Sequence, residues 1–308
     1  MKAFILCAGK GTRLLPLTES IPKPLLPLLD KPLLDHVIDM LLGAGITEFG
    51  VVIDHLKEQF YLNYPQKGYT FIEQGKQAGT GHAVQLLEEY VMKDEPFLVA
   101  AGDNLFPPYH VRKLIERIKE SGVDGVVSLI EMPPSRIINQ MATVRLGEDH
   151  QILEIKEKPA SEKEVFSLYG TAAIWVFKNS IFPAMKRSSL SSRGELEIQS
   201  GIQSLIDQGK VIKGVPLPEE NYIQLTSLED LYNLNMHFLE RQGLTNLIHD
   251  SVIAEEGTKI RHSIIMSGCK IKKGVTLDKV VALPGTRISS SVSRSLIHKD
   301  RVFTMQSN

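Results

Sequence analysis

The chain has 308 residues, of which 43% are hydrophobic and 23% charged, and its formal net charge is −1. This length predicts about two domains of an ordinary globular protein. A charge so close to zero disfavours nucleic-acid or membrane partners that bulk charge would recruit, and no apolar run approaches the ~20 residues that cross a bilayer. Cys7 and Cys269 suggest neither a metal pattern nor a disulfide framework, so we expect a cytoplasmic protein.

Strands and helices alternate from residue 1 to about 130. Short apolar runs bounded by polar or glycine residues predict strands, over residues 3–8, 49–53, 69–72, 97–101 and 125–130. Helical patterns lie between them, over residues 33–42, 81–90 and 110–121. This alternation predicts an α/β fold with a mostly parallel sheet, in which ligands sit at the carboxyl ends of the strands.

The pattern changes after residue 130. Further strands are predicted over residues 142–145, 152–156, 171–177 and 222–225. Helices are predicted over residues 180–187 and 196–208, and another over 228–241 closes this part of the chain. We interpret the additional strands as an antiparallel extension of the same sheet, which makes the sheet mixed, and we place the first domain at residues 1–242.

The tail, residues 243–308, shows a different repeat. Between residues 251 and 288, short apolar spikes with glycines recur about every six residues, and helical periodicity is absent. Such hexads indicate two or three degenerate coils of a parallel β-helix, with an irregular β-rich tail as the alternative. A short β-helix leaves an open apolar end that another chain would cover, so we expect a homo-oligomer formed through the tail.

The loop after the first strand is the most informative stretch of the sequence. It contains Gly9 and Gly11, and Arg13 and Lys23 follow as two cations of different geometry. Glycines let the backbone approach a ligand closely and direct its N–H groups at an anion, while Arg supplies a planar fork and Lys a point charge. This combination suits a triphosphate.

Other interpretations of this loop fit less well. The spacing half-matches the dinucleotide fingerprint, but Leu14 stands where the third glycine belongs and Pro16 prevents a helix from opening. No Gly-Lys-Ser/Thr ends the loop, which disfavours a Walker A motif. A plain Gly/Pro turn with solvated charges is the remaining alternative.

The run Gly9-Lys10-Gly11-Thr12-Arg13-Leu14-Leu15-Pro16-Leu17-Thr18, followed by Pro22-Lys23-Pro24-Leu25-Leu26-Pro27, resembles the signature of the sugar-1-phosphate nucleotidyltransferases. The resemblance implies a Rossmann-like core, a short left-handed β-helix tail and the transfer of a nucleotidyl group from an NTP to a sugar 1-phosphate. It also implies the catalytic residues, namely Arg13 at the β- and γ-phosphates, Lys23 at the α-phosphate and Asp103 at a metal ion.

The same resemblance implies where the nucleotide binds. Gln74 stands where family members that use uridine or thymidine nucleotides read the pyrimidine, and an amide offers both a donor and an acceptor to that edge. We therefore expect UTP or dTTP, with an exposed polar residue at a strand end as the alternative for Gln74. The implied nucleotide-binding residues are Ala8, Gly9, Gly11, Thr12, Arg13, Gln74, Gly79 and Thr80.

A magnesium ion is part of the implied chemistry. Asp103, in a Gly-Asp-Asn run after a predicted strand, would hold Mg²⁺, a hard cation that prefers oxygen ligands. The second metal aspartate of the family aligns with Gln224, a weaker ligand, and Asn221 is the alternative.

The acceptor half departs from the family pattern. Glu157 and Lys158 match its Glu-Lys-Pro, and Glu195 matches a segment at the sugar pocket. However, Ala142 replaces a usual glycine, and Thr171 begins Thr-Ala-Ala where Asn-x-Gly is usual. These changes leave the acceptor open. The alternatives are a non-catalytic regulatory subunit that binds a nucleotide or NDP-sugar, and a cytidylyltransferase for a non-sugar phosphate.

Overall fold

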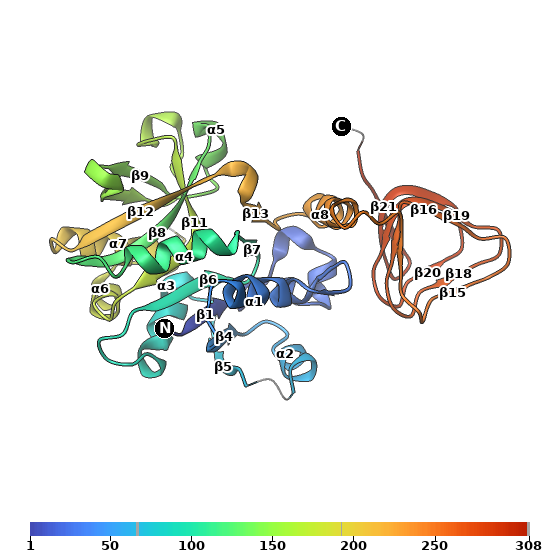
Figure 1. Ribbon diagram of the computed structural model, residues 1–308, viewed down its shortest axis with the longest axis horizontal. Coiled ribbons are helices and arrows are strands. Elements are labelled where there is room, and N and C mark those ends of the chain that lie inside the picture. The colour runs from blue at the N-terminus through green and yellow to red at the C-terminus, as the bar shows by residue number, and fades with distance from the viewer. Residues whose placement is uncertain (66–67, 192, 307–308) are drawn as a thin grey trace. The chain divides into compact units, whose positions relative to one another are not determined.

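The computed structural model describes residues 1–65, 68–191 and 193–306, and the chain divides into two compact units. The first unit contains residues 1–9 and 37–223, and the second contains residues 10–36 and 224–308. Figure 1 shows the elements of both units by label and colour. The domain boundary expected at residue 242 stays a prediction, and residues 307 and 308 of the expected tail lie outside the described residues.

A mixed sheet forms the centre of the first unit. Within the described residues it has nine strands, which are β1 (Ala3–Leu6), β4 (Phe49–Ile53), β5 (Thr70–Glu73), β6 (Phe97–Ala101), β8 (Val123–Glu131), β9 (Thr143–Leu146), β10 (Ile152–Lys156), β11 (Tyr169–Phe177) and β12 (Val211–Pro218). The strand order is β10-β9-β11-β6-β1-β4-β5, and β8 pairs with β11 and β12.

Strand direction divides this sheet as the sequence predicts. β6, β1, β4 and β5 are parallel, whereas β11 runs antiparallel to β6, β8 and β9. The parallel part places the ends of β1, β5 and β6 at one edge, because parallel strands finish on the same side of a sheet. The expected antiparallel extension is confirmed for β9, β10 and β11. It differs in two respects: β12 runs parallel to β8, and the strand predicted over residues 222–225 lies outside this sheet.

The helices of the first unit cover the sheet. They are α2 (Glu58–Asn63), α3 (Thr80–Gln85), α4 (Pro108–Arg117), α5 (Pro134–Ile137), α6 (Ile181–Arg187) and α7 (Ile198–Asp207). Helices α3, α6 and α7 pack against one another and bury a continuous apolar cluster with the sheet, in which Phe97 stacks on Phe182. Helix α1 (Leu33–Gly43) begins in the second unit and ends in the first.

The elements that the sequence analysis missed include α2, α5 and β12, and one predicted helix is shorter than expected. The predicted helix at residues 81–90 is α3 followed by a 3-10 turn, Leu86–Tyr90. Helix α2 is only six residues long. Strand β12 contains Pro216 and Pro218, which cannot donate ladder hydrogen bonds and therefore hide a strand from pattern analysis.

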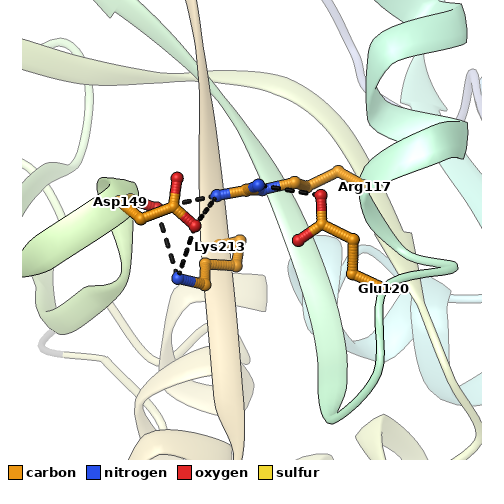
Figure 2. Close-up of polar contacts among 4 residues, drawn as sticks. All are labelled: Arg117, Glu120, Asp149 and Lys213. Carbon is orange, nitrogen blue, oxygen red and sulfur yellow. Dashed lines mark hydrogen bonds and ion pairs between the residues drawn. The ribbon is translucent and has the colours of Figure 1, made fainter.

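The turn between β9 and β10 is held by charge (Figure 2). Asp149 adopts a left-handed backbone with φ of 50°. Its carboxylate pairs with Lys213 at 3.1 Å and with Arg117 at 2.5 Å, and Arg117 also pairs with Glu120 at 2.8 Å. The hydrogen bonds from Lys213 and Arg117 lower the pKa of the Asp149 carboxyl. This network fixes the end of the hairpin that is remote from Ala142 and Glu157.

The second unit contains residues 10–29, which we call the signature loop, and the helix α8 (Leu228–Arg241) that contacts this loop. Three short 3-10 turns, Thr12–Leu14, Leu17–Glu19 and Lys23–Leu25, lead into the small hairpin of β2 (Pro27–Leu28) and β3 (Lys31–Pro32). Helix α8 starts at a capping box, in which Ser227 Oγ accepts from the Asp230 N–H and the Asp230 carboxylate accepts from the Ser227 N–H. The expected closing helix is confirmed.

The rest of the second unit is a stack of parallel coils. Leu247 pairs with Ile264, Ile264 with Val281, and Val281 with Leu296, so successive coils contain 17, 17 and 15 residues. Buried aliphatic side chains such as Ile271 and Leu277 fill the interior. The coil strands are β14 (Leu247–Ile248), β15 (Ile253–Ala254), β16 (Lys259–Arg261), β17 (Ile264–Ile265), β18 (Lys270–Ile271), β19 (Thr276–Ala282), β20 (Arg287–Ile288) and β21 (Val292–His298). The expected β-helix is confirmed by these parallel pairs.

The last coil differs from the expectation of an open end. Strand β22 (Arg301–Thr304) folds back antiparallel on β21 and pairs Leu296 with Phe303. One edge of the final coil is therefore satisfied within the chain, which weakens the argument that a partner must cover it.

Candidate active site

The signature loop brings two predicted residues together within the second unit. Gly11 has a left-handed backbone with φ of +63°, and a Cβ at this position would lie 3.1 Å from Lys23 Cβ. The Gly11 carbonyl accepts from Thr18 Oγ1 at 3.0 Å and closes the turn. A larger residue at position 11 would therefore displace the side chain of Lys23. Lys23 is half-buried, and Thr12 and Arg13 are exposed.

Helix α8 anchors the end of this loop through a residue that the sequence analysis missed. Asn235 is fully buried, and its Oδ1 accepts from the Leu29 N–H at 2.8 Å. Its Nδ2 donates to Pro27 O at 3.2 Å and to Leu231 O at 2.8 Å. One amide thus joins the β2–β3 hairpin to α8. The signal available in the sequence was an Asn on the apolar face of the predicted helix. A buried amide there needs hydrogen-bond partners.

The first unit carries Ala8 and Gly9 at the end of β1. Gln77 Nε2 donates to Ala8 O at 3.1 Å, so the segment after β5 contacts the segment after β1. This contact brings the predicted residue Ala8 close to the turn that carries Gln74 and Gly79. The parallel strands explain the proximity, since both segments leave the sheet at the same edge.

Gln74 is oriented by the turn itself. Its Nε2 donates to Gly79 O at 3.0 Å and contacts His82 Nδ1 at 3.3 Å. A carbonyl oxygen only accepts, so the amide nitrogen must face Gly79, and His82 Nδ1 must then accept as well. Burial, and next the charge of Lys76, lower the pKa of His82, which favours this neutral ring.

This arrangement alters the expected role of Gln74. Both amide hydrogens are engaged within the protein, so the side chain has its Oε1 acceptor to offer to a base, and not the donor–acceptor pair that the sequence suggested. The side chain is also buried, at 8% exposure, which contradicts the alternative of a solvated residue.

The turn at Gly79 has no room for a side chain. Gly79 has φ of +97°, and a Cβ there would lie 2.3 Å from Leu196 O. The Leu196 N–H donates to Ala78 O at 2.8 Å, and the Gly81 N–H donates to Leu196 O at 2.7 Å. Thr80 Oγ1 accepts from the Ile198 N–H at 3.2 Å, at the start of α7. The backbone of residues 196–198 therefore clamps the turn.

Asp103 follows β6 and is half-buried. Its Oδ1 accepts from Asn104 Nδ2, and Asn104 Oδ1 accepts from the Tyr222 hydroxyl. Burial first, and then the charge of Asp103, raise the pKa values of both Tyr222 and Cys7. Asn104 and Tyr222 thus orient Asp103, and Asn221 precedes Tyr222 in the same unit.

The donors present suit Mg²⁺ as one part of a site. Asp103 provides a carboxylate oxygen, and Asn221 provides an amide oxygen, which are the oxygen ligands that this ion takes. Within the residues that the structure describes, no group of three or more His, Cys, Asp or Glu side chains could hold a metal. Mg²⁺ takes one or two carboxylates and completes its shell with water and substrate phosphates, so this donor set fits a substrate-bound ion. Gln224 lies in the second unit, at the end of β13 (Ile223–Gln224).

The acceptor residues gather at one end of the β9–β10–β11 layer. Thr143 pairs with Lys156, so Ala142 and Glu157 are the next residues along these two strands. The Thr171 N–H donates to Ala142 O at 2.8 Å. Ala142 and Thr171, the two positions where the chain departs from the family, are therefore direct neighbours and both are buried.

Charged side chains surround Glu157. Its carboxylate lies 3.7 Å from Lys158 Nζ and 3.7 Å from Arg193 Nη2. Arg193 also pairs with Glu197 at 2.5 Å and reaches Glu195 at 4.0 Å. Burial and the nearby Glu197 raise the pKa of Glu157, while Lys158 and Arg193 oppose that shift. We call Glu157, Lys158, Arg193, Glu195 and Glu197 the acceptor cluster.

Two members of the acceptor cluster were missed in the sequence. Arg193 and the buried Glu197 flank the recognised Glu195 but carry no motif of their own. Charge alternation along residues 193–197 was the available signal, yet such runs are usually solvated.

Comparison with known proteins gives the wider relationship. Residues 2–241 match the family model described as nucleotidyl transferase. The bifunctional protein GlmU of Methanococcus maripaludis strain C5 is 33% identical over 87% of this chain, which spans 59% of that relative's length. The glucose-1-phosphate thymidylyltransferase of Streptomyces griseus is 27% identical over 94% of this chain and 80% of its own.

Solved structures support the fold. A structure of UDP-glucose pyrophosphorylase complexed with UDP-glucose superposes with a TM-score of 0.68, covering 78% of this chain and 98% of the other. The sequence identity is 20%, so this likeness concerns the fold alone. Among the residues described, no helix is both long and apolar enough to cross a membrane.

Proposed function

The chain belongs to the nucleotidyl transferase family, and on this premise we propose that it transfers a nucleotidyl group from an NTP to a sugar 1-phosphate. A phosphate oxygen of the sugar phosphate attacks the α-phosphorus of the NTP, a new O–P bond forms, and the bond to the leaving pyrophosphate breaks. The observation that carries the proposal is the family match, which spans every predicted nucleotide-binding residue.

We assign the charged groups as the sequence predicted. Arg13 binds the β- and γ-phosphates, and Lys23 neutralises the charge that develops at the α-phosphate. The packing of Gly11 against Lys23 supports this assignment, because it limits where the lysine can go. Asp103 is the proposed ligand of Mg²⁺, with Asn221 or Gln224 as a second, and the ion when bound supplies further neutralisation of the phosphates.

UTP and dTTP are the proposed nucleotides. The N3–H of uracil or thymine would donate to Gln74 Oε1, the acceptor that the turn leaves available. Glu157 and Glu195 would accept hydrogen bonds from sugar hydroxyls, and Lys158 would pair with the sugar phosphate. Assembly through the β-helix and a cytoplasmic location also belong to the proposal, the latter because Cys7 and Cys269 are free and buried.

The experiment is pyrophosphate release from UTP or dTTP with a mixture of sugar 1-phosphates. We expect release from the parent chain and a roughly 10²–10³-fold lower rate from Lys23→Ala, as for the loss of a preorganised charge at a transition state. Lys31→Ala, a change in the same loop segment, serves as the control. A Lys23→Ala rate within a few-fold of the parent would remove Lys23 from the proposed chemistry.

A further inference from the structure

One corner of the β-helix carries basic residues, whereas its other corners carry glycine. His262, Lys279 and Arg294 have left-handed backbones with φ of 46°, 55° and 43°. They follow Arg261, Asp278 and Ser293, which pair in register from coil to coil, so the three residues stack. At the other corners Gly257 stacks on Gly274 and Gly268 on Gly285. We call His262, Lys279 and Arg294 the cationic corner.

This choice of residues is unfavourable for folding alone. A side chain in the left-handed region strains the backbone, and glycine removes that strain at no steric cost. The neighbouring charges of Lys279 and Arg294 also repel each other. Strained residues that persist in this way cluster at functional sites, so the corner points to a role other than stability.

A small cavity of about 200 Å³ lies between this corner and helix α8. Met236 and Leu239 of α8 contribute apolar lining, and His262, Lys279 and Arg294 of the corner line it as well. Tyr232 Oη donates to Lys279 O at 2.9 Å and fixes the corner against the helix. All of these residues belong to the second unit, in which Figure 1 shows α8 beside the coils.

The charges of the corner are incompletely matched. His262 pairs with Asp278 at 3.2 Å, and Glu240 also lines the cavity. Lys279 and Arg294 have no ion pair among the described residues. Arg294 Nη2 donates to Gln306 O, but its Nε is buried without a hydrogen-bond partner in the described part of the chain. A guanidinium fork beside an ammonium suits the oxygens of a phosphate group.

We propose that this cavity binds a phosphorylated small molecule, with its phosphate on Lys279 and Arg294 and its organic part against Met236 and Leu239. A ligand in this cavity would contact α8. Asn235 of the same helix forms hydrogen bonds with Pro27 and Leu29 of the signature loop. Occupancy therefore changes how firmly the loop that carries Lys23 is held. Binding of the ligand does not depend on the proposed function, whereas the effect on turnover rests on the proposed function.

The test measures binding of phenyl phosphate, with inorganic phosphate as the second probe, by calorimetry on the full chain. Lys279→Gly removes a cation and relieves strain, so we expect a higher Tm together with about tenfold weaker phenyl phosphate binding. Lys299→Gly is the matched control, because Lys299 is also left-handed, with φ of 57°, but does not line the cavity. It should raise Tm without changing the affinity.

The outcomes separate the alternatives. Binding that Lys279→Gly weakens and Lys23→Ala leaves unchanged supports the site, as does tighter binding of phenyl phosphate than of phosphate. Equal binding by the parent and Lys279→Gly, or binding that Lys23→Ala alone abolishes, overturns it. Equal affinity for the two probes overturns the apolar part of the proposal. A turnover response to phenyl phosphate that survives in Lys279→Gly contradicts the regulatory role, even where the transfer reaction itself is established.

Discussion

The turn from Gln74 to Thr80 and the acceptor cluster both lie in the first unit, yet different interactions hold them. The turn is held by backbone geometry, with a glycine that admits no Cβ and a buried amide that satisfies a carbonyl. The acceptor cluster is held by ion pairs that the half-exposed Arg193 makes with Glu157 and with the buried Glu197. An added Cβ would collide with backbone in the turn, whereas the acceptor cluster depends on the charges of its side chains.

The two regions meet along residues 195–198. The backbone of Leu196 clamps the turn through Ala78 and Gly81, while the side chains of its neighbours Glu195 and Glu197 face Arg193. A change in the acceptor cluster can therefore reach the nucleotide turn through this segment, in which Glu195 Cβ also lies 3.0 Å from where a Cβ at Gly79 would stand. The following changes test how far the two regions are separate.

Gly79→Ala should have the largest effect. The new Cβ would meet Leu196 O at 2.3 Å in a left-handed backbone, so either the turn or the clamp must move. We expect turnover to fall by roughly 10²-fold, as for misplaced binding groups. Gly194→Ala is the control, since Gly194 is also left-handed but has no atom within 4 Å of its Cβ position. Similar losses from both changes would show that backbone strain, and not the clamp, is responsible.

Gln74→Ala should have an intermediate effect. It leaves Gly79 O and His82 Nδ1 without their donor and removes the Oε1 acceptor, a loss of about 1–3 kcal/mol. Titration of each NTP should show weaker UTP binding and a smaller preference for UTP over ATP. Gln77→Ala removes a comparable hydrogen bond, to Ala8 O, and should weaken all nucleotides equally. An unchanged preference in Gln74→Ala would mean that another group reads the base.

The pH dependence of stability gives the smallest effect. Burial and Glu197 raise the pKa of Glu157, so the ionised carboxylate destabilises the folded chain. The parent should lose stability as pH rises from below 4.5, the ordinary value, through the raised pKa. The Glu157→Gln variant has no carboxyl to ionise, so it should be more stable to unfolding than the parent at neutral pH. The difference in the free energy of unfolding should vanish at low pH. Denaturant unfolding at several pH values measures it, and a Glu157→Gln variant that is less stable at neutral pH contradicts the assignment.

The sequence predicted those helices and strands that have a regular pattern of apolar residues, and it proposed as site residues those that lie in recognisable motifs. β4 and β6 match their predicted ranges, and α8 does as well, because the periodicity of apolar residues is a local signal. β12 was missed because its prolines obscure the pattern. Arg193 and Asn235 were missed for another reason. Their roles arise from tertiary contacts with Glu157 and Leu29, which no local pattern contains.

The orientation of Gln74 teaches the same lesson at a predicted site. The sequence marks the residue as a candidate, but the direction of its amide depends on Gly79 O, which the turn brings within 3.0 Å. Chemistry at a motif residue can be predicted from residue type, whereas the atom that remains available to a ligand depends on the fold.

The most direct test of the account is pyrophosphate release measured for each NTP against a panel of sugar 1-phosphates and other phosphorylated acceptors. We predict release with UTP or dTTP and little with ATP or GTP, with the same nucleotide preference for every accepted sugar phosphate, because the turn and the acceptor cluster are held separately. A preference that changes with the acceptor would contradict that separation. No release with any pair, despite nucleotide binding, would contradict nucleotidyl transfer itself and leave a binding protein that senses nucleotides.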